Sequence, residues 1–289
     1  MPKSLGQIHT ANFAVTDIQA QGIQYLLDPA GELSGQLNNM VRQAGNLFKV
    51  VGIDMTVSEY GGNLGGGSIN GELRYYAPTR GRCNAIKQAF GAVREGAKIQ
   101  GVKLTNNENY DFRVPLRNTA LYTAPYGNLV NKATINGTDE LVLANSDGVS
   151  GAFDIYNAQI EPSQGGVTPT FTHGYGIPGS GGFTATDFVL NEGAIFDPAM
   201  KDIASTEMES IPFQVSFDPQ GEGMVTNWMW RPDPALYLAV LTGQFELHID
   251  ELDTDGPEVD ALTLDIAIHI AGWKSIMGNP DKKKRRGRR

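Results

Sequence analysis

Residues 61–68 form a glycine-rich stretch, the first place where the chain could bind a phosphate group through its backbone N–H groups. Gly62 and Gly67 have the four-residue gap of a nucleotide-binding P-loop, but Ser68 stands where that loop requires lysine. A strand pattern follows instead of a helix, and Asn70 occupies the third glycine position of a dinucleotide fingerprint. We therefore expect a flexible loop between strands, with no bound cofactor.

An acidic run near the carboxyl end resembles half of a calcium-binding loop, because oxygen ligands recur two residues apart before Gly256. Its members are Asp250, Glu251, Asp253, Asp255, Glu258 and Asp260. Leu262 stands where the loop requires a bidentate glutamate, and strands rather than helices flank the run. The pattern favours a solvated hairpin tip, with calcium at Asp253 and Asp255 as the alternative.

Catalytic and metal-ligating patterns are otherwise missing from the sequence. The four histidines, His9, His173, His248 and His269, are scattered without the spacing typical of zinc sites. Cys83 is the only cysteine, which excludes an intrachain disulfide and a CxxC motif, and no Gly-x-Ser-x-Gly elbow occurs. We predict that the protein is not an enzyme, that it holds no metal or cofactor, and that His248 and His269 are ordinary surface residues.

The last eight residues, 282–289, could bind a polyanion. Seven of them are basic and none is acidic: Lys282, Lys283, Lys284, Arg285, Arg286, Arg288 and Arg289. Without these seven, sixteen basic side chains face thirty-two acidic ones, so residues 1–281 carry a net charge of −16. A block of like charge stays extended and is typical of segments that bind nucleic acid or an anionic lipid surface. A solvated terminus or an import signal is the alternative.

Aromatic residues cluster in pairs, and such rings can serve as stacking platforms for bases or sugars. The set comprises Tyr75, Tyr76, Tyr122, Tyr126, Trp228, Trp230 and Tyr237. Only Arg74 and Arg231 lie close to them as basic neighbours, which is few for a nucleic-acid platform. We expect these rings to pack in a core or a subunit interface, with glycan binding as the alternative.

The elements that must carry these residues are mainly strands. Gly (35 residues) and Pro (15) are abundant, whereas charged residues make up only 19 % of the chain. Apolar and polar residues alternate at 245–250 and again at 262–271, which predicts a hairpin with one buried face; similar alternation occurs at 51–58 and 213–217. Two short helices are expected, one after Ser34 and one from N-cap Asn84 to Gln100. No apolar run is long enough for a signal peptide or a membrane span.

Short sequence anchors recur on the two sides of a Gly- and Pro-rich stretch at residues 160–184. Asp28-Pro29-Ala30 answers to Asp197-Pro198-Ala199, and Val57-Ser58 answers to Val215-Ser216, among others, in the same order. Such self-similarity indicates an internal duplication, with chance similarity of short anchors as the alternative. The Gly- and Pro-rich composition of residues 160–184 predicts a domain boundary in this stretch.

With two strand-rich halves, repeated anchors, an inserted helix at Asn84–Gln100 and glycine-rich loops, the chain resembles the double jelly-roll major capsid proteins of icosahedral bacterial viruses with an internal membrane, the finnlakevirus and corticovirus type. The resemblance implies a mainly β fold of two tandem eight-stranded jelly-roll barrels with one or two short inserted helices. It implies an N-terminal barrel at 1–165, a C-terminal barrel at 166–281 and a basic tail at 282–289.

The resemblance also implies a function. The chain would form homotrimers, which build a capsid lattice together with minor capsid proteins, and the tail would face the genome or the internal membrane. It would be made in the host cytoplasm and reside in the virion. Two alternatives remain, a β-sandwich glycan-binding module and a single-jelly-roll nucleocapsid protein with a projecting second domain.

Overall fold

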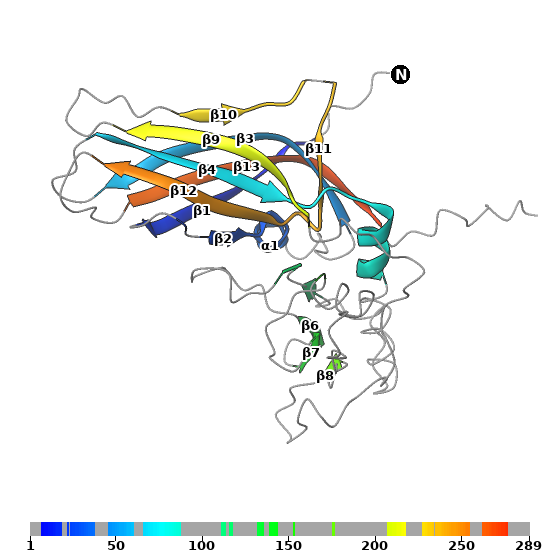
Figure 1. Ribbon diagram of the computed structural model, residues 1–289. Helices are drawn as coiled ribbons and strands as arrows, with labels where there is room; N and C mark the ends of the chain where they lie inside the picture. Colours follow the sequence, from blue (N-terminus) through cyan, green and yellow to red (C-terminus); the bar gives the residue numbers. More distant parts are fainter. Residues whose placement is uncertain are drawn as a thin grey trace, which may run out of the picture.

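The protein is described by a computed structural model in which strands dominate (Figure 1). The described residues are 7–18, 22, 24–37, 46–60, 66–87, 111–113, 116–117, 132–135, 139–143, 153, 175–176, 207–217, 227–233, 235–254 and 262–276. The prediction of a mainly β fold is confirmed. No helix within these ranges has the length and apolar character that crossing a membrane requires.

Two antiparallel sheets make the body of the molecule. The first, sheet A, has the order β1-β13-β3-β10, and β11 also pairs with β3. Its strands are β1 (His9–Ile18), β3 (Asn46–Tyr60), β10 (Trp228–Trp230), β11 (Leu238–Leu241) and β13 (Leu262–Ser275). The second, sheet B, has the order β2-β12-β4-β9. Its strands are β2 (Gln24–Leu27), β4 (Gly67–Tyr75), β9 (Glu209–Phe217) and β12 (Phe245–Thr254).

Strand pairing in the two sheets is nested. The first strand pairs with the last (β1–β13), the second with the last but one (β2–β12), β3 with β10 and β11, and β4 with β9. The pairs β13–β3 and β12–β4 then join neighbouring pairs within each sheet. The chain thus behaves as one long hairpin that is rolled up, and this is the strand order of a single jelly roll.

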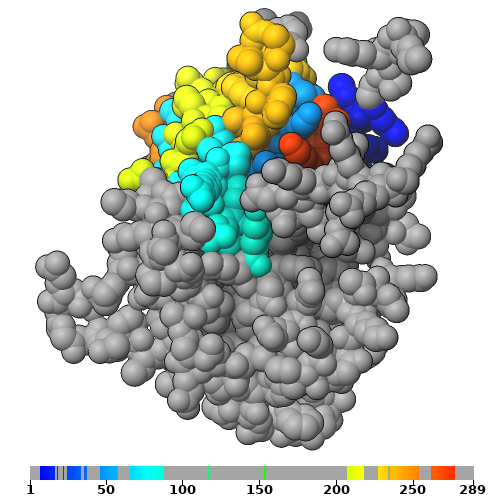
Figure 2. Space-filling view, turned by 90° about the vertical axis from the view of Figure 1, so that its right-hand side faces the viewer, coloured from blue at the N-terminus to red at the C-terminus, as the bar shows by residue number. Residues whose placement is uncertain are grey.

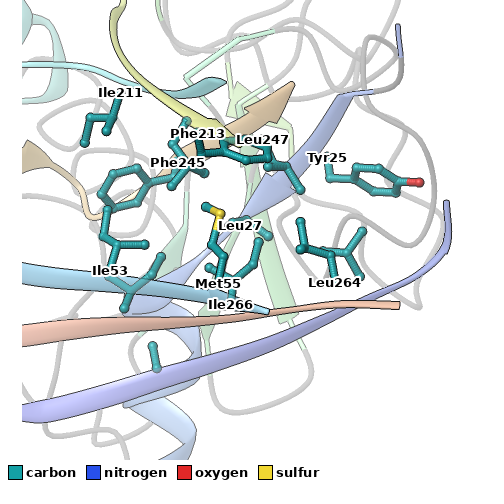
Figure 3. Packing of buried hydrophobic residues seen from close by; sticks show 14 of the residues in the cluster. Tyr25, Leu27, Ile53, Met55, Ile211, Phe213, Phe245, Leu247, Leu264 and Ile266 are labelled. Atoms are coloured by element: carbon teal, nitrogen blue, oxygen red, sulfur yellow. The ribbon is translucent and has the colours of Figure 1, made fainter. Parts of the chain in front are cut away.

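The core lies between the two sheets (Figure 3). Alternate residues of each strand point inward, as for Ile53 and Met55 of β3, Phe213 of β9 and Leu247 of β12. The inward residues of β13 are Leu262, Leu264, Ile266, Ile268 and Ile270, all at most 1 % exposed. Each such side chain contributes about 1.5–3 kcal/mol through removal of apolar surface from water. The alternation predicted at 245–250 and 262–271 is therefore confirmed.

Two tandem barrels are not confirmed. Both sheets combine strands from residues 1–165 with strands from residues 166–281, so the described strands of the two halves share one core. Val57 and Val215, matched as duplicated anchors, lie in opposite sheets of the same sandwich. The boundary predicted at 165/166 falls outside the described residues.

The predicted hairpin of residues 245–250 and 262–271 is wrong in its pairing. β12 and β13 lie in different sheets, β12 beside β2 and β4, and β13 beside β1 and β3. The period of two predicts which face of a strand is buried, but it contains no information about which strand lies beside it. Long-range pairing decided the arrangement here.

The described helix starts differ from the predicted ones. α1 (Pro29–Gln36) starts with Pro29 in its first turn and already contains Ser34, whereas residues 38–45, which the helix predicted after Ser34 would include, lie outside the described residues. Residues 80–87 are helical, and the hydroxyl of Thr79 accepts a hydrogen bond from the Arg82 backbone N–H at 3.1 Å. Thr79, not Asn84, is therefore the N-cap, because its side chain supplies the acceptor that the helix start lacks. Residues 88–100 fall outside the described residues.

A long insertion separates β4 from β9. It contains a small sheet of four strands, β5 (Asp111–Arg113), β6 (Lys132–Ile135), β7 (Asp139–Leu143) and β8 (Tyr175–Gly176). The buried Arg82 guanidinium donates hydrogen bonds to Ala77 O, where the chain leaves β4, and to Glu207 O, where it returns to β9. One side chain thus ties both ends of the insertion to the same end of the sandwich.

Candidate functional site on the outer face of sheet A

The two outer faces of the sandwich differ in character. Outward positions of sheet B include Glu72 and Arg74 of β4 and His248 and Asp250 of β12, which are charged or titratable. Outward positions at the centre of sheet A include the small or uncharged residues Asn12, Ala14, Thr56 and Ala267 and also the acidic residues Asp54 and Asp265. Uncharged side chains are typical of the centre of a protein–protein interface, so the state of these two carboxylates decides the character of the face.

A network of side chains neutralises one of these two carboxylates, that of Asp54. His269 Nε2 lies 2.8 Å from Asp54 Oδ2, and His269 Nδ1 lies 3.1 Å from the Thr10 hydroxyl. On the other side of Asp54, Arg231 Nη1 approaches Oδ1 to 2.6 Å and Nη2 donates to Oδ2 at 2.9 Å. The pairings β1–β13 and β13–β3 place these residues on neighbouring strands of the face.

Gly52 makes room for this network. A Cβ atom at Gly52 would lie 2.7 Å from Arg231 Nη1 and 2.9 Å from its Cδ, so the guanidinium occupies the space of the missing side chain. Arg231 Nη1 also donates to Ile53 O at 3.2 Å. The arginine therefore lies flat against β3 instead of extending into solvent.

The electrostatics of the network favour its charged form. The hydrogen bond from Arg231, assisted by His269, holds the pKa of the Asp54 carboxyl below its usual value against the opposing effect of burial. The same hydrogen bond raises the pKa of Arg231. The series Thr10, His269 and Asp54 has the hydroxyl, imidazole and carboxylate of a proton relay. The Asp54 carboxylate is bound mainly by Arg231, however, so the main effect of the network is to neutralise the charge of Asp54.

A pocket of about 560 Å³ opens beside the network. Its lining includes Asn12, Asp54, Asn227, Met229 and Asp265. Met229 is 66 % exposed at the rim. Asp54 is neutralised, whereas the Asp265 carboxylate has no ion-pair partner among the described residues. The pocket therefore combines apolar walls with one available negative charge.

Residues 235–237 project beyond the edge strand of sheet A. Leu236 is 65 % exposed and Tyr237 51 % exposed, and Figure 2 shows this region in gold at the top of the molecule. Asp233 shapes the turn, since its carboxylate accepts from the Ala235 N–H at 2.8 Å and its carbonyl accepts from the Leu236 N–H at 2.7 Å. The Lys49 ammonium lies 4.7 Å from the centre of the Tyr237 ring.

The sequence did not reveal the importance of His269 and Glu246. His269 was predicted to be an ordinary surface residue but links Thr10 to Asp54. Glu246 alternates with apolar residues, which indicates exposure, yet it is 0 % exposed because Arg117 of the insertion covers it at 3.0 Å. The alternation in the sequence predicts that both side chains point outward from their strands. It cannot predict the residues that they contact, which lie more than a hundred positions away.

Other predicted sites have separate outcomes. The tail residues 282–289 lie outside the described residues, and so do residues 255–261, which contain the second half of the acidic run. Tyr122, Tyr126 and His173 also lie outside them. Among described residues no group of three or more His, Cys, Asp or Glu could hold a metal ion, although Asp250, Glu251 and Asp253 are described. The glycine-rich stretch does lead into a strand, β4. Burial raises the pKa of the Cys83 thiol, against the opposing charges of Lys87 and Arg82.

Four of the seven aromatic residues behave as packing residues, whereas Tyr237 is exposed. Tyr75 and Tyr76 are buried, and Trp228 and Trp230 are partly buried against the core, with the Trp228 and Phe213 rings 6.1 Å apart in an edge arrangement. Rings held in this way do not present a flat platform to a sugar.

Comparison of the chain with protein-family models, with curated proteins and with solved structures finds no match.

Proposed function

We propose that the protein is a structural subunit of a viral shell, the major capsid protein of an icosahedral virus, and that it has no catalytic role. The observation that carries this proposal is the nested strand order of a jelly roll, an architecture that recurs in capsid proteins. A face that combines small side chains, a neutralised Asp54 and the exposed apolar residues Met229 and Leu236 supports a subunit that meets copies of itself.

In its details the proposal follows the single-jelly-roll alternative. A tandem double jelly roll requires each half of the chain to close its own sandwich, whereas the described strands of both halves share one. The second unit would then be the insertion between β4 and β9, which contains the β5–β8 sheet. It would project from the end of the sandwich where Arg82 ties down its two ends.

The basic tail would bind the polyanion enclosed by the shell, either the genome or an anionic internal membrane. Fully extended, eight residues reach at most roughly 26–29 Å, so the tail would touch a neighbouring layer without entering it deeply. The negative body, at −16 without the tail, would not compete for the same partner. Homotrimers, a capsid lattice with minor capsid proteins and residence in the virion belong to the same proposal.

The oligomeric state of the purified chain tests this function. We expect trimers or larger bodies by size-exclusion chromatography with light scattering, and ring-like capsomers or shells by electron microscopy. A chain that stays monomeric at every concentration up to the solubility limit, in low and in high salt, contradicts the proposal. A glycan array on the same sample tests the other class, and oligosaccharide binding by a monomer would favour the β-sandwich lectin alternative.

A further inference from the structure

We propose that residues 235–237 of one copy insert into the pocket on the outer face of sheet A of a second copy. This contact rests on the proposed function, because it names the surface through which shell subunits would associate. It uses the two features of sheet A that remain without a role in the monomer, the projecting apolar turn and the open pocket beside Met229.

The pocket is large enough for these side chains. Its volume of about 560 Å³ falls within the usual range for sites that enclose a small organic molecule, about 300–1,000 Å³. Ala14, Ala267 and Met229 offer apolar surface to a leucine and a tyrosine ring. Asn12 and Asn227 on the exposed walls can hydrogen-bond the tyrosine hydroxyl.

The turn at residues 235–237 is too far from the pocket of its own subunit to fill it. Met229 pairs with Asp54 at the pocket, whereas Leu238 pairs with Val50 four residues further along β3. At about 3.4 Å per residue the two features are separated by roughly 14 Å along the same edge. The hydrogen bonds that Asp233 accepts from the Ala235 and Leu236 N–H groups fix the turn in its projecting form, so little conformational freedom is lost on docking.

Charge complementarity favours the same occupant. The Lys49 ammonium accompanies Tyr237 and would enter the pocket with it, while Asp265 supplies the carboxylate without an ion-pair partner among the described residues. Arg231 and His269 already occupy Asp54, which leaves Asp265 to pair with the incoming lysine.

Within this proposal the contact is head-to-tail, so that the turn of each copy meets the pocket of the next copy and not of the same partner. Head-to-tail contacts close into rings when the rotation between copies is suitable, and they extend into larger assemblies when it is not. Each copy retains a free pocket or a free turn until a ring closes. The contact is therefore of the type that a trimeric capsomer requires.

A charge exchange tests the contact in the full-length chain. We expect Lys49→Asp and Asp265→Lys each to weaken association by about tenfold or more, since each places like charges together. The double variant Lys49→Asp/Asp265→Lys should recover most of the loss. Gln214→Lys, exposed on β9 of sheet B, is the matched control and should associate like wild type. Thermal unfolding of each variant identifies any loss caused by misfolding.

A proximity measurement gives a second readout. In a Cys83→Ser background, Leu236→Cys and Asn12→Cys chains are mixed and oxidised; we expect disulfide-linked dimers that contain one chain of each kind, and few in either chain alone. Wild-type association without charge-exchange rescue and without mixed dimers would overturn the contact while leaving the shell function intact. A monomeric wild type would overturn both.

Discussion

At the scale of single residues, Gly52 and Glu246 decide the character of the two outer faces, Gly52 because it has no side chain and Glu246 because its side chain is buried. Gly52 lacks a side chain, and the Arg231 guanidinium fills the space and reaches Asp54. Glu246 is fully buried on an outward position because Arg117 covers it. Neither role is encoded by neighbours in sequence, since Gly52 and Arg231 are 179 residues apart and Glu246 and Arg117 are 129 apart.

The Asp54 network predicts an acid-sensitive contribution to stability. Because the folded-state pKa of Asp54 is lowered, its contribution is complete above the unfolded value of about 3.9 and is lost as the pH falls through the lower folded value. We expect Asp54→Asn to be less stable than wild type at pH 7 and to lose less stability on acidification below about pH 4. Urea unfolding at a series of pH values measures this, and equal acid slopes would contradict it.

The Glu246–Arg117 pair predicts a strong coupling between the insertion and the sandwich. Arg117→Met removes the ion-pair partner at 3.0 Å from the fully buried Glu246 carboxylate, so we expect a loss of about 2–3 kcal/mol. Glu246→Gln added to Arg117→Met should restore at least half of that loss, because the buried charge is then removed as well. A double-mutant cycle by urea unfolding measures the coupling; strictly additive effects would argue against it.

At the scale of elements, β4 is one of the two central strands of sheet B, and it includes a glycine in close contact with its neighbours. A Cβ atom at Gly71 would lie 2.2 Å from the His248 backbone oxygen and 2.8 Å from the Phe213 ring. The glycine therefore permits close approach of β4 and β12 near the register shift between Ile249 and Glu251.

Gly71→Ala should destabilise the sandwich by about 2–3 kcal/mol, because backbone as well as ring must move. Ser68→Ala on the same strand is the control and should change stability by less than about 0.5 kcal/mol. Thermal or urea unfolding of the two variants measures the difference. A stable Gly71→Ala protein would show that β4 and β12 are further apart than described.

Strands were predictable from the sequence, but their partners were not. Alternation identified the buried faces of β3, β9, β12 and β13, since every second residue of a half-buried strand must be apolar. It could not show that β12 and β13 belong to different sheets, or that Arg117 would bury Glu246. The helix starts were missed because Pro29 and Thr79 are local N-terminal signals that lie before the apolar periodicity on which the prediction relied.

At the scale of the whole molecule, the nested strand order places the first and the last described strands next to each other. β1 and β13 pair from Ile18↔Leu262 to His9↔Ile270, so the terminal strands lie side by side in the centre and edge of sheet A. The repeated sequence anchors suggested two barrels because they recur in both halves. The candidate site on sheet A combines β1, β3, β10 and β13, which lie far apart in the sequence. Local sequence patterns therefore could not predict it.

The basic tail predicts salt-dependent binding of nucleic acid by the whole molecule. If all seven charges engage single-stranded DNA, log K should fall with log salt with a slope of about −5, and deletion of residues 282–289 should abolish that dependence. Fluorescence anisotropy at 50–200 mM salt measures the slope. Trimers should survive the deletion, whereas assembly or packaging should fail; normal yields of filled particles would contradict the proposed role.

The antiparallel pairing of Tyr75 with Glu209 brings the exit and the re-entry of the insertion to adjacent positions on β4 and β9. Paired residues in such a ladder have Cα atoms about 5 Å apart, a distance that a two-residue turn can bridge. Over evolutionary time, the sandwich can therefore acquire, exchange or shed a whole module at this junction without any change in its own strand order. Diversity among related lineages should be concentrated there, while the rolled scaffold stays constant.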